Sequence, residues 1–247
     1  MKISKFSQLS ASVMANAFYA MKNFPVMLVN TILAPFGLLI IIFFVSHGTL
    51  LNVGILGGFI LVMVNNGISI QGDLTHLRND MKLQDMLVSS PVSPAIYVAG
   101  IALSELVFSV PDLIVLSVLA VIFIHISVIS TLTVAAVMLL TFMFSVSLGF
   151  FISTISRDVI EGWAFMGLIS MLLSTLPPVY YPITYIPFPF RYLAYISPTT
   201  FSAIIAQSSI GFVKFSASFI LTSWIVLIMV SIALIVFAVK RSIWREE

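Results

Sequence analysis

The chain has 247 residues, of which 60% are hydrophobic and 8% are charged, and its eleven basic and nine acidic side chains leave a net charge of +2. An average soluble domain has about 25% charged residues, so this composition excludes a water-soluble protein. No basic block of the kind that follows a phosphate backbone is present, and a chain without cysteine has neither disulfides nor thiolate metal sites. The sequence predicts an all-α membrane protein that binds no nucleic acid.

Residues 1–23 are predicted to form an amphipathic helix at the inner surface of the membrane. Five apolar residues recur at spacings of three and four, namely Phe6, Leu9, Val13, Ala17 and Met21. This spacing places them on one face of a helix, which would lie flat in the interface before the chain enters the membrane. The alternative is an ordinary amphipathic helix that packs against the bundle.

Charge-free stretches divide the rest of the chain into six predicted spans. A spanning helix needs about 20 mostly apolar residues, and the charge-free stretch between Lys22 and Asp73 has room for two. The predicted transmembrane helices are residues 25–45, 53–72, 95–124, 131–156, 162–177 and 215–239. With the interfacial helix they form a single transmembrane domain over residues 1–247.

The basic residues predict that both ends of the chain are cytoplasmic, because Lys and Arg are retained on that side of a membrane. With the N-terminus inside, the cytoplasmic set is Lys2, Lys5, Lys22, Arg78, Lys82, Arg157, Lys240, Arg241 and Arg245. Only Arg191 and Lys214 fall outside. We therefore expect a multi-pass protein of the plasma membrane.

The third span contains the only ionisable groups expected at membrane depth, Glu105 and Asp112. Seven residues apart, they lie on nearly the same face of a helix. An acid at mid-membrane costs roughly 2.5 to 3.5 kcal/mol, so this face should turn toward other helices or a wet cavity, and Pro111 should bend the helix. Two interpretations remain open: a polar pathway or proton-titrating site, and structural contacts between helices or subunits.

The segment between the last two spans, residues 177–214, is predicted to be a proline-rich re-entrant hairpin on the outside. It holds six of the eleven prolines, so it cannot be one straight helix. Ser197 before Pro198, with Gly211 at the far end, predicts a short helix over residues 198–210. Because this helix is uncharged but too short to span, it should dip into the outer leaflet or lie on it.

No motif for catalysis or nucleotide binding is present in the sequence. It has no His-Glu-x-x-His zinc motif, no Gly-x-Ser-x-Gly elbow and no Gly-x-x-x-x-Gly-Lys-Ser/Thr phosphate loop. The three histidines, His47, His76 and His125, are expected in different loops and should not share a metal. If ATP drives this protein, ATP and Mg must be bound by another polypeptide.

Two stretches of the chain resemble the ABC-2 type permeases, the membrane subunits of exporters for drugs, polysaccharides and related lipids. Residues 181–201 are similar to the family's aromatic-Pro-apolar start, second proline and Asn-Pro-like step, with Ser197 where many members have Asn. Residues 87–94, Leu-Val-Ser-Ser-Pro-Val-Ser-Pro, are similar to its Leu-x-x-x-Pro segment, although the usual Gly-Lys that follows is Gly100-Ile101 here.

The resemblance covers the layout of the whole chain and implies a half-transporter. Two copies of the chain, or this chain and a paralogous permease, would pair in the membrane lipid above two ATP-binding subunits. Contacts with those subunits are expected at Leu77, Arg78, Met81, Lys82, Asp85 and Met86, and secondary contacts at Arg157, Asp158 and Glu161. The outer gate would be shaped by Pro182, Pro187, Arg191 and Pro198. The alternatives are solvated loops that only hold topology and a passive lid.

The predicted function is that of a permease subunit that moves a small amphipathic, drug-like or lipid/glycan substrate outward, driven by a separate ATPase. Importers of the common type would normally show a Glu-Ala-Ala-x-x-x-Gly loop, which is absent. The first alternative is a proton-coupled secondary carrier that uses Glu105 and Asp112, although such carriers usually contain internal repeats and no convincing duplication is found. The second is a membrane anchor or assembly factor without transport.

Overall fold

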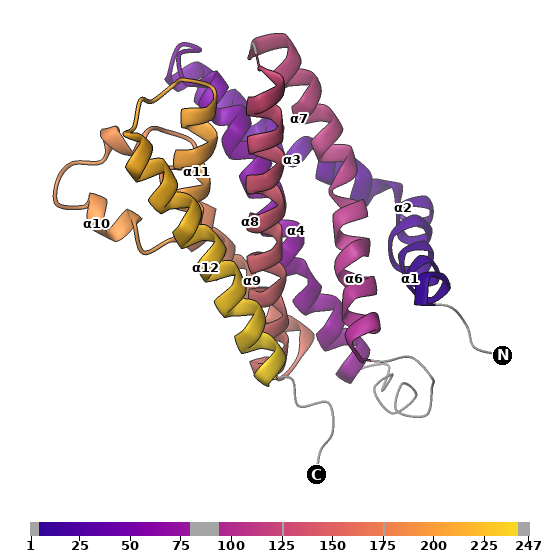
Figure 1. Ribbon diagram of the computed structural model, residues 1–247. Coiled ribbons are helices and arrows are strands. Elements are labelled where there is room, and N and C mark those ends of the chain that lie inside the picture. Colours follow the sequence, from indigo (N-terminus) through magenta and orange to yellow (C-terminus); the bar gives the residue numbers. More distant parts are fainter. Residues whose placement is uncertain (1–4, 80–93, 125, 175, 242–247) are drawn as a thin grey trace.

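The computed structural model describes residues 5–79, 94–124, 126–174 and 176–241, and in this part of the chain every regular element is a helix (Figure 1). The elements are α1 (Lys5–Val13), the π-helix η1 (Met14–Phe18), α2 (Tyr19–Asn23), α3 (Pro25–Val45), α4 (Leu51–Asn79), α6 (Pro94–Phe108), α7 (Val110–Phe123), α8 (Val128–Ile155), α9 (Val159–Ser174), the 3-10 helix η2 (Ile183–Tyr185), α10 (Arg191–Ala194), α11 (Pro198–Ser209) and α12 (Ala217–Arg241).

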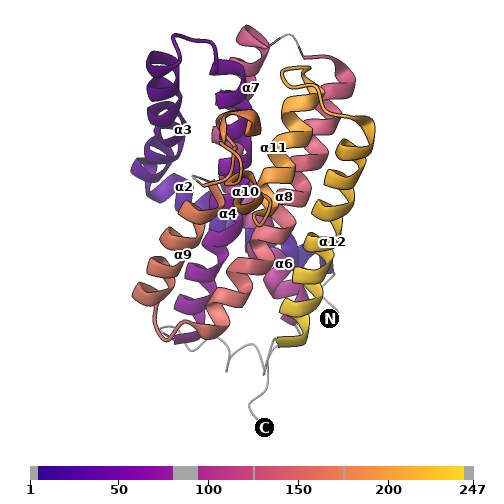
Figure 2. The same ribbon diagram turned by 90° about the vertical axis from the view of Figure 1, so that its left-hand side faces the viewer.

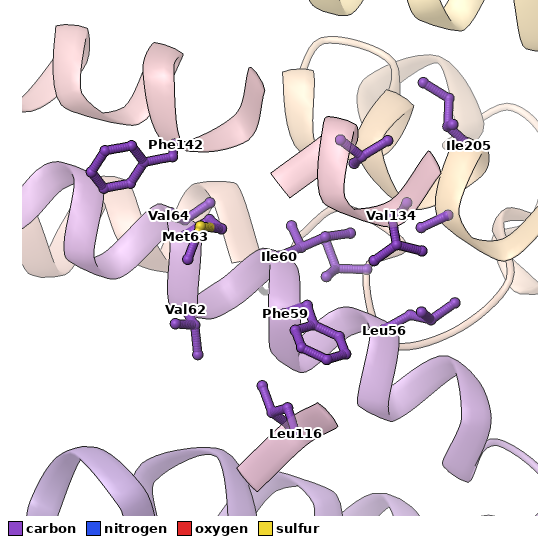
Figure 3. Packing of buried hydrophobic residues seen from close by; sticks show 14 of the residues in the cluster. Leu56, Phe59, Ile60, Val62, Met63, Val64, Leu116, Val134, Phe142 and Ile205 are labelled. Atoms are coloured by element: carbon purple, nitrogen blue, oxygen red, sulfur yellow. The ribbon is translucent and has the colours of Figure 1, made fainter. Parts of the chain in front are cut away.

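Helix α4 is the centre of the bundle, because it packs against α6, α7, α8, α9 and α11. An apolar surface on all sides is typical of a helix buried in this way. Figure 3 shows apolar side chains of α4 gathered with Leu116 of α7, Val134 of α8 and Ile205 of α11. The neighbours of α4 therefore share one hydrophobic core around it.

Two glycines allow α4 and α8 to approach each other closely. A Cβ atom on Gly67 would lie 2.5 Å from the Cβ of Ser145, and one on Gly149 would lie 2.7 Å from the carbonyl oxygen of Ile68. Small residues are enriched where membrane helices meet, since association there depends on close packing of the backbones. The contact between α4 and α8 is thus interlocked at two places.

Among the residues whose side chains the structure describes, three helices are long and apolar enough to cross a membrane, over the segments Leu51–His76, Val128–Ile155 and Ala217–Ala238. Helices α6 and α7 add a fourth span if this pair, bent by 41°, counts as one. Pro111 stands in the first turn of α7, where no backbone N–H is needed, and the predicted bend is confirmed. Helix α9 has 16 residues and rises about 24 Å, less than the roughly 30 Å of a hydrocarbon core. Six spans with both termini inside stay a prediction.

Helix α4 ends later than expected. The predicted span stops at Gly72, where the first charge follows, but the helix continues to Asn79. Leu74 and Thr75 are buried in this extension, whereas Asp73 and His76 are exposed. Asp73 thus keeps an exposed part within a helix that buries its neighbours, so the first charge does not mark the end of the helix.

The N-terminal segment is helical, as predicted, and its expected apolar face turns toward the bundle. Helices α1 and η1 lie beside α6 (Figure 1), α2 leads on to α3, and Ala17 of η1 is fully buried. Phe6 is the exception with an exposed fraction of 81%. Met14, Phe18 and Tyr19 are exposed as well. The segment is therefore packed against the bundle and still presents apolar side chains outward, while its place at a membrane surface stays a prediction.

Candidate functional site

The two acids of the third predicted span are both buried, on either side of the break between α6 and α7. Glu105 is 7% exposed and Asp112 is 4% exposed. Their burial agrees with the expectation that this face turns toward other helices, since an uncompensated acid facing lipid is costly. The two acids have different surroundings.

Glu105 binds to α4 through two side chains one turn apart. The hydroxyl of Ser69 donates to Oε2 of Glu105 at 2.5 Å, and the carboxyl group of Asp73 forms a hydrogen bond with that of Glu105. Two carboxyl groups can share a hydrogen bond only when one of them holds a proton. This cluster is a contact between helices, which the sequence analysis missed because Asp73 was assigned to a loop. The spacing of Ser69 and Asp73 on one helical face is the signal that could have found it.

Asp112 belongs to the first turn of α7, and its Oδ1 atom is buried without a hydrogen-bond partner. Leu116, one turn further along α7, would touch a Cβ atom placed on Gly58 of α4, so this part of α7 packs tightly on the core. Within the described residues, Glu105 is paired to α4 and Asp112 is not. The structure therefore favours a contact between helices for Glu105 and supplies no partner for Asp112.

The residues expected to receive an ATP-binding subunit are only partly described. Met81, Lys82, Asp85 and Met86 lie outside the described residues, and so do the side chains of Leu77 and Arg78 at the end of α4. These assignments stay predictions.

The second expected contact site forms the start of α9. Oδ1 of Asp158 accepts a hydrogen bond from the backbone N–H of Glu161 at 2.7 Å, and Oε2 of Glu161 accepts one from the backbone N–H of Arg157 at 2.6 Å. Such reciprocal bonds satisfy N–H groups that have no partner within the helix. Both acids thus have a helix-capping role that the Asp-x-x-Glu spacing could have revealed.

The residues expected at the outer gate shape the segment between α9 and α11. Arg191 donates from Nε to the carbonyl oxygen of Ile186 at 2.8 Å and from Nη2 to that of Thr184 at 2.9 Å. Pro182 is buried, Pro187 is exposed, and Pro198 occupies the first turn of α11. Arg191 therefore ties the backbone of this segment together, and a role of the four residues in an outer gate stays a prediction.

Helix α11 lies inside the bundle, where it packs against α4, α8 and α12 (Figure 2). The predicted helix over residues 198–210 is confirmed, and Gly211 follows it with a φ of 71°. Every residue from 199 to 207 is buried, so this helix packs within the bundle, and its place in or on the outer leaflet stays a prediction. Ser197 stands at the predicted N-cap position, but its hydroxyl caps no backbone N–H and pairs instead with the hydroxyl of Thr199 at 2.8 Å.

Polar side chains of α11 are satisfied by hydrogen bonds to the surrounding elements. The hydroxyl of Thr199 donates to the carbonyl oxygen of Leu173 at 2.5 Å, and that of Thr200 donates to Ala194. Nε2 of Gln207 lies 3.0 Å from the carbonyl oxygen of Pro178. These bonds join α11 to the end of α9 and to the segment that follows it.

Tyr180 and Tyr181 complete this segment. The hydroxyl of Tyr181 donates to the carbonyl oxygen of Leu176 at 3.3 Å, whereas the hydroxyl of Tyr180 is buried without a partner.

A second set of buried polar groups lies where α4 meets α8 and α9, and these groups are not satisfied. Both polar atoms of the Gln71 amide, the hydroxyl of Thr75 and the hydroxyl of Ser145 lack hydrogen-bond partners, and all three residues are fully buried. None of these residues stands out in the sequence, because an isolated Gln, Thr or Ser in an apolar helix gives no signal. We refer to the contact of Gln71 and Gly72 with α9, together with the buried Thr75 one turn further along α4, as the α4–α9 seam.

Comparison with known proteins adds a family to this description. A family model described as ABC-2 type transporter matches residues 8–210, from the N-terminal helix to the end of α11. No curated protein matches the chain. Among the described residues, no group of three or more His, Cys, Asp or Glu side chains could hold a metal ion.

Proposed function

The chain belongs to the ABC-2 type transporter family and is a permease of that type, and from this premise we propose that it is the membrane half of an exporter driven by a separate ATP-binding subunit. The observation that carries the proposal is the family match over residues 8–210 in a chain with no phosphate-binding loop of its own. ATP and Mg would then be bound by the partner, and this chain would supply the path through the membrane.

The partner would dock where α4 ends and α9 begins. The proposed contacts are Leu77, Arg78, Met81, Lys82, Asp85 and Met86 after α4, with Arg157, Asp158 and Glu161 before α9. Support comes from the capping bonds between Asp158 and Glu161, because they make the first turn of α9 a rigid end that a partner could move. The basic residues of this region also agree with a cytoplasmic location.

Six spans with both termini in the cytoplasm of the plasma membrane remain our proposed topology. Helices α3, α4, the pair α6 and α7, α8, α9 and α12 would be the spans. The short α9 would be completed by the segment that follows it, which is held within the bundle by α11. Pro182, Pro187, Arg191 and Pro198 would shape the outer gate.

A second copy of the chain, or a paralogous permease, would complete the transporter. Helices α3 and α9 lie at the same edge of the bundle, one above the other in Figure 2, and both pack against α4. Both expose large apolar side chains there, among them Ile41 and Phe44 on α3 and Leu168 and Met171 on α9. An apolar edge of this kind suits another membrane helix or lipid.

The apolar side chains of the proposed spans also suit a small amphipathic, drug-like or lipid/glycan substrate.

The test is purification of the C-terminally tagged chain from its native membrane, followed by identification of partners and an ATPase assay. We expect a nucleotide-binding subunit to co-purify, and Arg78→Glu to release it. Lys214→Glu makes the same charge change near the start of α12, on the proposed outer side, and should leave the complex intact.

Purification of the chain alone, without ATPase activity, would contradict the proposal. The proton-coupled carrier would then be tested by proton-flux assays on Glu105→Gln and Asp112→Asn. The unpartnered Oδ1 of Asp112 is the observation that keeps this second function in view.

A further inference from the structure

The strongest unexplained feature of the molecule is the group of orphaned polar atoms at the α4–α9 seam. Gln71 and Thr75 are four residues apart on one face of α4, and both have an exposed fraction of 0%. Neither polar atom of the amide nor the hydroxyl of Thr75 has a partner. A buried polar atom without a hydrogen bond is unfavourable. Native structures therefore seldom keep three such atoms on adjacent turns of one helix, unless another state of the protein or a bound molecule supplies their hydrogen bonds.

The seam is closed too tightly to hold a molecule between α4 and Gly162. A Cβ atom on Gly162 of α9 would collide with Oε1 of Gln71, and its distance from Cδ of that amide would be 3.2 Å. Next to it, a Cβ atom on Gly72 would lie 3.1 Å from the ring of Trp163. The two helices therefore meet through glycines, and the amide of Gln71 packs directly on α9.

Helix α9 is the element that can leave this contact. Its other side is open, as Ile160 and Leu168 are both more than half exposed. By contrast, α8 is interlocked with α4 through Gly67 and Gly149. The capped first turn of α9 would also move as a unit, because Asp158 and Glu161 hold it together.

We propose that the α4–α9 seam is a gate. The N-terminal half of α9 parts from α4, and the Gln71 amide and Thr75 hydroxyl then hydrogen-bond to water that enters from the connection between α8 and α9. Satisfaction of these groups favours the open state, and tight packing of the glycines favours the closed one. That an ATP-binding subunit operates this gate rests on the proposed function, but the opening itself does not.

The chain contains no cysteine, so a single Thr75→Cys substitution gives one labelling site without background. The probe is a maleimide, applied to native membranes made permeable to it, with the denatured protein as the reference for complete labelling. We expect slow but measurable modification of Thr75→Cys in the folded protein. The proposal would be overturned if the cysteine at position 75 stayed completely unlabelled by the maleimide over a time in which the gate should open many times.

Two alanine variants of α9 make a matched pair for this assay. Gly162→Ala inserts a methyl group against Gln71 and should accelerate labelling at position 75 about tenfold or more. Gly167→Ala gives the same gain in helix propensity but has no atom within 4 Å of its new Cβ, so labelling should not change. Equal rates in the two variants would show that α9 does not part from α4 at this place.

Gln71→Leu should change the labelling rate at position 75 in the opposite direction, and it tests the gate even if Gly162→Ala does not fold. An apolar side chain of similar size removes the orphaned amide and favours the closed seam, so labelling at position 75 should slow severalfold. Unchanged or faster labelling would contradict a gate that opens to hydrate Gln71. The assay needs neither ATP nor a partner, so a failed co-purification would overturn the exporter proposal and leave this result standing.

Discussion

Two buried glutamines of this bundle have opposite surroundings. Gln207 of α11 is 2% exposed, and its Nε2 lies 3.0 Å from the carbonyl oxygen of Pro178 and 3.4 Å from that of Tyr181. Gln71 of α4 is 0% exposed, and neither polar atom of its side chain has a partner. The same side chain thus ties one region together and leaves another with an unsatisfied amide.

The difference extends to the hydroxyl groups around each glutamine. Around α11, Thr199 and Thr200 donate to backbone carbonyls, whereas Thr75 and Ser145 near Gln71 donate to none. Tyr180, whose hydroxyl is unpaired, is the exception near α11. A network in which every polar group is hydrogen-bonded stabilises one arrangement of the helices. Buried polar groups without partners instead favour a change to an arrangement in which they find partners. We infer that α11 is the fixed part of the bundle and the α4–α9 seam the movable part.

The largest expected effect comes from Gly57→Ala, which tests whether the segment beside α11 is fixed on α4. A Cβ atom on Gly57 would lie 2.6 Å from the ring of Tyr180 and 2.7 Å from the carbonyl oxygen of Val179. Because a backbone atom cannot give way cheaply, we expect a loss of about 3 kcal/mol in the free energy of unfolding. Unfolding in mixed micelles with a denaturing detergent measures it.

Gly37→Ala is the control for this substitution, since a Cβ atom on Gly37 has nothing within 4 Å. It should leave the free energy of unfolding unchanged or slightly higher. If both variants unfold alike, the segment around Tyr180 is not seated on α4, and the fixed half of the comparison is wrong.

Gln207→Leu should destabilise the protein by about 2 kcal/mol. The substitution keeps a side chain of similar size but leaves the carbonyl oxygens of Pro178 and Tyr181 without their donor inside the bundle. The same unfolding assay measures the change. A neutral result would mean that these carbonyls find water, and that α11 is no more fixed than the seam.

Gln71→Leu should raise the free energy of unfolding by about 1 kcal/mol, because it removes an amide that has no hydrogen-bond partner. This effect is smaller than that of Gln207→Leu and opposite in sign. Transport, once a substrate is known, should fall, since the gate stays closed. A loss of stability as large as that of Gln207→Leu would show that Gln71 is paired in the closed protein, and the contrast between the two regions would disappear.

The sequence could predict the helices of this fold better than their ends. Helix α3 occupies residues 25–45, the predicted range, because a proline begins it and a charge-free run defines it. The end of α4 was misjudged, since a helix can carry Asp73 on its exposed side while Leu74 remains buried. A charge shows that one face meets a polar environment, and does not show that the helix has ended.

The contacts of the candidate site are harder to predict from the sequence than the helices are. The bond between Asp73 and Glu105 joins positions 32 residues apart, and only the packing of α6 on α4 brings them together. Gln71 and Gln207 likewise look the same in sequence, because a hydrogen-bond partner is a property of the folded neighbourhood. The cap formed by Asp158 and Glu161 is local, and the spacing alone could have predicted it.

The smallest expected effect concerns the hydrogen bond between Thr141 of α8 and Ser202 of α11, whose hydroxyls lie 2.9 Å apart. In a double-mutant cycle with Thr141→Val and Ser202→Ala, we expect a coupling of about 0.6 kcal/mol, because hydroxyls in a membrane find other partners when helices separate. Thr133→Val, at a half-buried position of α8 whose hydroxyl bonds only within its own helix, should be additive with Ser202→Ala. A coupling near zero for the first pair would mean that α11 and α8 are held together by packing alone, so that the hydrogen bonds of α11 would no longer explain why this half of the bundle is fixed.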